Sequence, residues 1–191
     1  MISNAEIKRV KALQSKKFRD ESGLFVVEGE KMVAEALESG LQVEAVYRRD
    51  EIGEQAMARI SSLNSPSPVV AVVRQAAAPD IDEIRSFVRS CGRDMLAIAL
   101  DEIRDPGNLG TIIRLADWYG IDAVFCSAGT VELYNPKVVQ STMGAIFRKK
   151  VIYCDLNNIF DIFASNGLPI YGTFLEGEDI YRSELSSGGL I

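Results

Sequence analysis

Histidine is absent from this 191-residue sequence. Its absence excludes the usual Ser/His/Asp triad and most zinc sites, and it removes the commonest general base. Any catalysis must therefore use other polar side chains, backbone groups or a cofactor. We expect no metal ion in this protein.

Long apolar runs and cysteine are also scarce. No apolar run reaches the roughly 18 residues that a membrane span needs, and the first six residues lack the pattern of a secretory signal. The three cysteines, Cys91, Cys126 and Cys154, are widely spaced and form neither a disulfide framework nor a metal-ligand pattern. These features predict a cytoplasmic protein with buried cysteine side chains and no membrane contact.

Basic residues are unevenly distributed along the chain. The net charge is −6, which by itself argues against a general nucleic-acid binder. Residues 1–19 nevertheless carry six basic side chains against one acid, Glu6. The six are Lys8, Arg9, Lys11, Lys16, Lys17 and Arg19. Such a basic corner can bind a polyanion even on an acidic protein.

Helical and extended patterns alternate along the sequence. They predict helices over residues 4–19, 31–39, 52–63, 81–90, 136–145 and 159–165. The loop at residues 105–110 is expected to open a further helix that runs to about 119, with Arg114 one turn into it. The patterns predict strands over residues 24–27, 43–47, 69–73, 95–100, 121–126, 151–153 and 169–173. Because this alternation is typical of a parallel sheet, we expect an α/β fold. Asn4 is expected to cap the first helix, and Leu37 is expected to face the core.

A change of composition at residues 75–79 predicts a domain boundary. We expect a small α/β domain over residues 1–75, a linker with a bridging helix over 76–94, and a second domain over 95–191. Ligands of a parallel sheet bind beyond the carboxyl ends of its strands.

The sequence Asp-Pro-Gly-Asn-Leu-Gly at residues 105–110 predicts a tight turn from a strand into a helix. Free N–H groups at such a helix start can bind anions. The pattern matches neither common phosphate-binding glycine motif, so a structural turn capped by Asn108 is equally consistent with it. Ile112, Ile113 and Leu115 are expected to be buried. Arg114 among them is either an edge residue or a functional group directed at the strand ends.

Several stretches carry a resemblance to a known family. Residues 100–117, LDEIRDPGNLGTIIRLAD, closely resemble the first signature motif of the SpoU/TrmH methyltransferases of the SPOUT superfamily. Residues 131–148, VELYNPKVVQSTMGAIFR, look like the next recurrent stretch of that family. Residues 11–13, 16–19 and 25–29 are similar to the ribosomal-protein-like substrate-binding domain that is often fused ahead of the catalytic domain.

This resemblance implies an S-adenosyl-L-methionine-dependent RNA methyltransferase. The expected reaction transfers a methyl group to a ribose 2′-hydroxyl, and the N-terminal domain favours ribosomal RNA over transfer RNA as the substrate. The expected fold is a parallel-sheet SPOUT domain with a trefoil (α/β) knot, and the expected assembly is a homodimer.

The resemblance also assigns roles to residues. Arg114 matches the catalytic arginine, and Asn108 matches the asparagine that shapes the catalytic pocket. A guanidinium is a poor base, so we expect Arg114 to bind a phosphate and the developing alkoxide. Thr173, Phe174 and Leu175 match the strand end that contacts the cofactor, although ordinary strand-end packing would also explain them.

Eight basic residues are candidate RNA contacts. They are the six residues of the basic corner together with Lys137 and Arg148. A solvated turn or charge run explains Lys137 and Arg148 equally well, and phosphate contacts of this kind add affinity but little sequence choice.

Two later motifs of the family, a Gly-x-Glu-x-x-Gly loop and a Ser-Leu-Asn sequence, do not occur in the 191 residues. We therefore expect a fragment truncated before the knot is complete, or a protein that has lost activity, and weak binding of S-adenosylmethionine. One alternative is a non-catalytic RNA-binding module with a decayed or truncated catalytic half. Another is a different nucleotide-binding α/β enzyme that uses the turn at residues 105–110.

Overall fold

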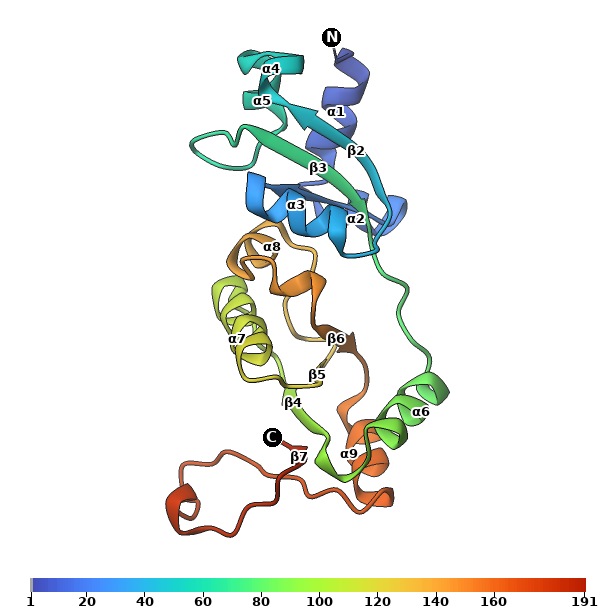
Figure 1. Ribbon diagram of the computed structural model, residues 1–191, viewed down its shortest axis with the longest axis vertical. Helices are drawn as coiled ribbons and strands as arrows, with labels where there is room; N and C mark the ends of the chain where they lie inside the picture. The colour runs from blue at the N-terminus through green and yellow to red at the C-terminus, as the bar shows by residue number, and fades with distance from the viewer. Residues whose placement is uncertain (1) are drawn as a thin grey trace. The chain divides into compact units, whose positions relative to one another are not determined.

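The computed structural model describes residues 2–191, which form two compact units. The first unit contains residues 2–77, 105–114 and 131–148. The second contains residues 78–104, 115–130 and 149–191. Figure 1 labels the elements of both units, and each unit is described separately below.

The first unit contains a three-stranded sheet of β1 (Leu24–Glu28), β2 (Val43–Arg48) and β3 (Val69–Arg74), in the order β1-β3-β2. Both outer strands pair antiparallel with β3. The expectation of parallel pairing is therefore wrong for this unit. The chain crosses over through a helix between β1 and β2, so these two strands run parallel to each other. They are not neighbours, because β3 lies between them and runs in the opposite direction.

Most helices of the first unit are shorter than expected. They are α1 (Asn4–Ala12), α2 (Lys16–Ser22), α3 (Glu30–Glu38), α4 (Arg49–Ile52), α5 (Glu54–Ile60) and α8 (Pro136–Ser141). The single helix predicted over 4–19 is wrong, because the extended backbone of Ser15 separates α1 from α2. The helix predicted over 52–63 is also wrong, because Gly53 has a φ of 85° that ends α4 and starts α5.

Helix caps and helix burial differ from two further expectations. Ser3, rather than Asn4, caps α1, and its side chain accepts a hydrogen bond from the Glu6 N–H. In α3, Met32 and Val33 are buried, whereas Leu37 is 53% exposed. The predicted inward orientation of Leu37 is therefore wrong. The helix predicted over 136–145 ends already at Ser141, and a short 3-10 turn follows Gly144, whose φ is 95°.

The second unit contains a parallel sheet, as predicted. Its strands are β4 (Leu96–Leu100), β5 (Ala123–Cys126), β6 (Lys150–Tyr153) and β7 (Gly189–Leu190), in the order β6-β5-β4-β7. Every pair in it is parallel, so all four carboxyl ends lie at one edge. Helices α6 (Ile81–Cys91) and α9 (Leu156–Ser165) also belong to this unit. Their buried apolar residues form one core with those of the strands, including Val88, Phe125 and Phe163.

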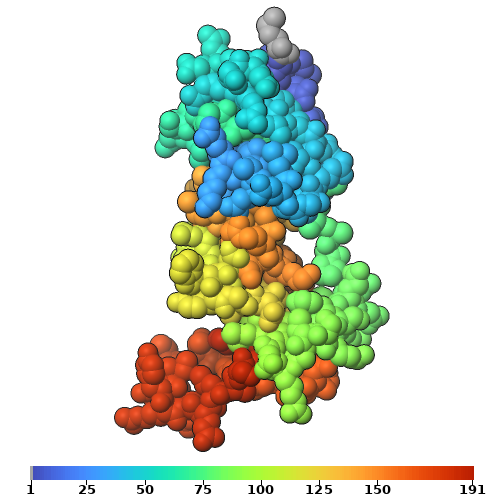
Figure 2. All heavy atoms as spheres, in the orientation of Figure 1, coloured from blue at the N-terminus to red at the C-terminus, as the bar shows by residue number. Residues whose placement is uncertain are grey.

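The strand predicted over 169–173 is wrong. Ile170 makes only an isolated bridge to Leu190. The partner β7 has two residues and already pairs with β4 on its other side, so no longer ladder can form here. The segment that follows α9, drawn in red, stands out from the rest of this unit (Figure 2), in keeping with the exposed side chains of Phe174 and Tyr181.

Candidate functional site

Helix α7 (Pro106–Trp118) carries the two residues with predicted catalytic roles. Its first turn is capped by Asp105, whose carboxylate accepts the N–H of Asn108 at 2.8 Å. The alternative in which Asn108 itself is the cap is therefore wrong. Asn108 lies inside the helix, and its side chain is exposed.

Arg114 lies more than two turns into α7, rather than one turn as expected from the sequence. Its side chain is exposed. Six residues separate it from Asn108, so the two side chains leave the helix axis in directions about 120° apart and about 9 Å apart along it. Ile113 is fully buried, but Leu115 is 49% exposed, so its predicted burial is wrong.

Helix α8 packs closely on the start of α7. The hydroxyl of Ser141 donates to the carbonyl of Pro106, with an oxygen–oxygen distance of 3.1 Å. A Cβ on Gly110 would lie only 1.9 Å from the Ser141 Oγ atom. Only glycine allows this approach, so the second glycine of the motif at residues 105–110 is explained by helix packing.

The basic corner divides into exposed and buried residues. Lys8, Arg9, Lys11, Lys16 and Lys17 are exposed on α1 and α2. Arg9, Lys16 and Lys17 each pair with an acid one turn away, at 3.1, 2.5 and 3.9 Å. Exposed pairs of this kind are weak, so a phosphate can compete for these cations.

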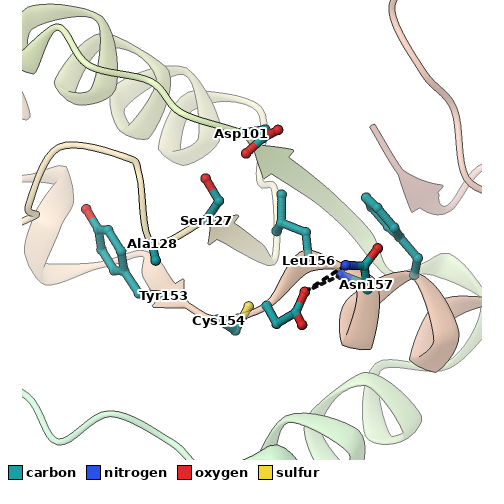
Figure 3. A pocket seen from close by; sticks show the side chains of 9 residues that line it. Asp101, Ser127, Ala128, Tyr153, Cys154, Leu156 and Asn157 are labelled. Atoms are coloured by element: carbon teal, nitrogen blue, oxygen red, sulfur yellow. Dashed lines mark hydrogen bonds between the residues drawn. The ribbon is translucent and has the colours of Figure 1, made fainter.

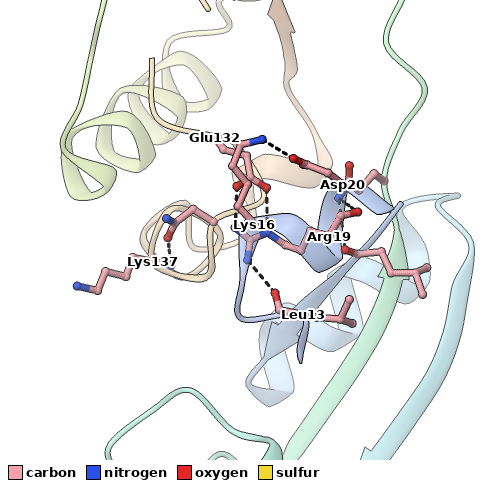
Figure 4. A network of polar contacts seen from close by, with 9 residues as sticks. Leu13, Lys16, Arg19, Asp20, Glu132 and Lys137 are labelled. Atoms are coloured by element: carbon pink, nitrogen blue, oxygen red, sulfur yellow. Dashed lines mark hydrogen bonds and ion pairs between the residues drawn. The ribbon is translucent and has the colours of Figure 1, made fainter. Parts of the chain in front are cut away.

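Arg19 behaves differently from the other basic residues of the corner. Its side chain is 2% exposed and donates to both oxygens of Glu132, at 2.8 and 2.6 Å. A third bond runs to the carbonyl of Leu13 (Figure 4). The guanidinium of Arg19 is thus fully occupied within the first unit.

The two other predicted RNA contacts, Lys137 and Arg148, lie in the segment 131–148. Lys137 is exposed in the first turn of α8 and points away from the Arg19 network (Figure 4). Arg148 forms a salt bridge with Glu35 of α3, and its side chain is 45% exposed.

The predicted cofactor residues lie in the segment after α9. Thr173 and Phe174 line a cavity of about 830 Å³ in the second unit, whereas Leu175 is fully exposed and does not line it. Carboxylates of Glu178 and Glu184 and hydroxyls of Ser183 and Ser186 also line this cavity. The Tyr171 hydroxyl lies 2.8 Å from the Ser186 hydroxyl, and hydrogen bonds from Ser186 lower the pKa of Tyr171.

A second cavity was not anticipated from the sequence. It has a volume of about 660 Å³ and lies where β4, β5 and β6 end (Figure 3). Asp101, Ser127 and Asn157 contribute polar groups to it, and Phe160 contributes an aromatic ring. The general rule about strand ends could have found it, because Asp101 and Ser127 each directly follow a predicted strand.

Residues 2–191 bring no three acidic, cysteine or histidine side chains together in a way that could hold a metal ion. No helix within the same range is long and apolar enough to cross a membrane.

Two family models match the chain. Residues 95–191 match the SpoU rRNA Methylase family, and residues 4–76 match the MRM3-like substrate binding domain. These matches fall on the same stretches that carry the resemblance seen in the sequence.

Individual relatives agree with these models. The 23S rRNA (guanosine(2553)-2'-O)-methyltransferase RlmP of Bacillus subtilis is 30% identical over 194 residues, covering 94% of this chain and 74% of the relative. The mitochondrial rRNA methyltransferase 3 of Xenopus tropicalis is 35% identical over 162 residues, covering 76% of this chain and 39% of that longer protein.

A solved structure supports the same family. The AdoMet-bound rRNA methyltransferase from Sinorhizobium meliloti superimposes with a TM-score of 0.81 at 27% identity, covering 100% of this chain and 78% of that one. Sequence motifs, family models and fold therefore agree, and the chain belongs to the SpoU rRNA methylase family.

Proposed function

We propose that this protein methylates the 2′-hydroxyl of a ribose in RNA, with S-adenosylmethionine as the methyl donor and ribosomal RNA as the substrate. The observation that carries this proposal is the 30% identity to RlmP across 94% of the chain. That relative is named as a 2'-O-methyltransferase of 23S rRNA. The similarity in fold to an AdoMet-bound rRNA methyltransferase supports the same cofactor.

The cavity lined by Thr173 and Phe174 suits S-adenosylmethionine. Its volume of about 830 Å³ can hold a nucleoside with an attached amino-acid chain. The ring of Phe174 offers a stacking surface for the base, and the carboxylates of Glu178 and Glu184 favour the positively charged sulfonium. When bound, the cofactor supplies an activated methyl group.

Arg114 and Asn108 are the proposed catalytic residues. The exposed guanidinium of Arg114 can bind the phosphate beside the target ribose and stabilise negative charge on the 2′-oxygen as the hydroxyl proton passes to water. This role needs no loss of a proton from the guanidinium, which is a poor base. The carboxamide of Asn108 shapes the pocket that receives the ribose.

The proposed RNA surface lies on α1 and α2. It consists of Lys8, Arg9, Lys11, Lys16 and Lys17, with Lys137 and Arg148 as outlying contacts. Arg19 is omitted because it is buried and already bound to Glu132. We assign RNA binding to residues 1–75, a linker role to 76–94 and methyl transfer to 95–191.

A homodimer fits the exposed apolar side chains of α7. Trp118 is 83% exposed, and Leu115 lies beside it on the same helix at 49% exposure. Apolar groups gathered in this way favour contact with another chain. The ribosomal-protein-like character of the N-terminal domain, the trefoil knot of the SPOUT domain and the cytoplasmic location stay predictions.

The proposal is tested by methyl transfer in vitro. The full-length gene product is incubated with tritiated-methyl S-adenosylmethionine and ribosomal RNA that lacks ribose methylation. We expect label in RNA that survives alkaline hydrolysis as a 2′-O-methylated dinucleotide. RNA binding without any transfer would instead support the non-catalytic RNA-binding module.

A further inference from the structure

The segment 131–148 contacts both the RNA-binding helices and the catalytic helix of the first unit. We propose that it is a coupling element, and that Glu132 and Ser141 are positioning residues for Asn108 and Arg114. This inference rests on the proposed function and deepens it, because it states how RNA held on α1 and α2 is linked to the geometry of α7.

The first part of the coupling element is fixed to the N-terminal helices and strands. Glu132 receives two hydrogen bonds from the buried guanidinium of Arg19. Two residues later, the ring of Tyr134 lies 4.6 Å from that of Phe25 on β1. The hydroxyl of Tyr134 accepts the N–H of Ala76 at 3.0 Å. Charge, ring packing and a backbone bond therefore hold this part to residues 19, 25 and 76.

The far part of the coupling element is fixed as well. Gly144 has a φ of 95°, and a Cβ there would lie 2.0 Å from a carboxylate oxygen of Glu35. That same carboxylate pairs with Arg148. Helix α8 is thus anchored to the N-terminal part of the unit on both of its sides.

Helix α8 in turn holds the start of α7. The Ser141 hydroxyl shares its one proton between the carbonyls of Pro106 and Val138, at 3.1 and 2.9 Å. The backbone of Ser141 also lies 2.9 Å from where a Gly110 Cβ would be. This close packing means that a displacement of α8 is transmitted to the start of α7.

The two contacts lie close together on the coupling element. Glu132 and Ser141 are nine residues apart, and α8 is only about 9 Å long. Misplacement of a reacting group by about 1 Å can slow catalysis about 100-fold. A loosened α8 would therefore leave RNA binding on α1 and α2 intact while it disturbs the positions of Asn108 and Arg114.

The contact at Ser141 is tested with Ser141→Ala and a matched control. Ser165 of α9 donates to the Ile162 carbonyl at 3.0 Å, three residues earlier, as Ser141 does to Val138. Ser165→Ala therefore removes the same local bond without touching α7. In the full-length protein we expect Ser141→Ala to lower kcat about 10-fold with KM for RNA within about 2-fold, and Ser165→Ala to change neither. Equal effects of the two variants, or a change in KM alone, would overturn the assignment.

The contact at Glu132 is tested with Glu132→Gln, which keeps the shape of the side chain and removes its charge. Its control is Glu44→Gln, which disrupts a different arginine–glutamate pair, with Arg74. Amide hydrogen exchange over residues 106–114 is compared in the absence of RNA. We expect faster exchange there in Glu132→Gln and wild-type exchange in Glu44→Gln.

The exchange measurement needs no methyl transfer. If the wild-type protein modifies no RNA, the proposed function fails while the exchange result still decides whether α8 holds α7. If exchange over residues 106–114 is the same in Glu132→Gln and in wild type, the coupling is overturned even when the enzyme is active.

Discussion

The buried guanidinium of Arg19 binds both carboxylate oxygens of Glu132, a residue 113 positions later in the chain, at 2.8 and 2.6 Å. Arg19 is 2% exposed and Glu132 is 19% exposed. With the further bond to Leu13, the guanidinium has an acceptor on three of its nitrogens. This pairing explains why Arg19 of α2 is not available to bind a phosphate.

Removing Glu132 should destabilise the protein more than removing Arg19. Glu132→Ala leaves a buried charge without its partner, and we expect the free energy of unfolding to fall by about 3–5 kcal/mol. Arg19→Met leaves only a carboxylate that water can reach, so the loss should be smaller. Urea denaturation measures both, with Arg9→Ala as an exposed control expected to lose less than about 1 kcal/mol. A Glu132→Ala variant as stable as the control would show that the pair contributes little.

Salt dependence should identify the RNA surface. Combined replacement of Lys8, Lys11, Lys16 and Lys17 by alanine removes four exposed positive charges from α1 and α2. Each lost phosphate contact should reduce the slope of log K against log salt by about 0.7–0.9. Filter binding of ribosomal RNA between low and physiological salt gives the slope. The control replaces Arg85 and Arg89 of α6 by alanine. If the control reduces the slope by the same amount, α1 and α2 are not the RNA-binding surface.

Arg114→Ala should separate RNA binding from turnover. We expect RNA affinity within a few-fold of wild type and methyl transfer at least about 100-fold slower, because a charged donor is lost where charge develops. Arg85→Ala, an exposed arginine on α6, serves as the control. Wild-type transfer by Arg114→Ala would exclude a catalytic role for this residue.

Part of this arrangement could be predicted from the sequence, because the information is local. Apolar periodicity located most strands and helices, and the motif around Asn108 and Arg114 identified the helix that carries them. Breaks at Ser15 and Gly53 were missed because a single backbone angle ends a helix there without altering the apolar pattern. The strand predicted over 169–173 failed because its formation depends on the length of a distant partner.

The burial of Arg19 could not be predicted from the sequence either, because it also depends on a distant partner. Nothing local distinguishes Arg19 from Lys16 or Lys17, since its partner is Glu132 in a remote segment. The cavity at Asp101 and Ser127 is different, because both residues directly follow a predicted strand and the rule about strand ends could have located it. Non-local pairing therefore explains the errors at Arg19 and at residues 169–173, whereas the missed breaks at Ser15 and Gly53 have a local cause.

The three cysteines should differ in reactivity. Burial raises the pKa of Cys126 to about 12 and that of Cys154 to about 11, and it also raises the pKa of Cys91. Since the thiolate is the reactive form, alkylation of the native protein by iodoacetamide at pH 8 should be slowest at Cys126. Mass spectrometry of peptides gives the rates, and the urea-denatured protein, in which all three should react alike, is the control. Fast native alkylation of Cys126 would contradict the buried position of β5.

Acid should remove a small stabilising contribution of Glu6. The hydrogen bond from the Tyr47 hydroxyl, and then that from Arg9, lower the pKa of Glu6 below its unfolded value. The ionised carboxylate therefore stabilises the fold above the unfolded pKa, and this contribution is lost as the pH falls through the folded pKa.

The Glu6→Gln variant tests whether the ionised carboxylate stabilises the fold and whether acid removes this contribution. Because Glu6 is partly exposed, the variant should be less stable than wild type by under about 1 kcal/mol at pH 7, and the difference should vanish in acid. Urea denaturation across pH, with Glu38→Gln as the exposed control, measures it. If the difference in stability between the variant and wild type grows as the pH falls, the stabilising role of the ionised Glu6 carboxylate is contradicted.

The central claim is that the protein methylates ribose in ribosomal RNA, and ribose-methylation mapping tests it most directly. Ribosomal RNA is sequenced after partial alkaline cleavage from cells with the gene, without it, and with the Arg114→Ala allele. We predict at least one ribose that is protected from cleavage only when the wild-type gene is present. An identical protection pattern in all three strains, with the wild-type protein expressed, would contradict the account.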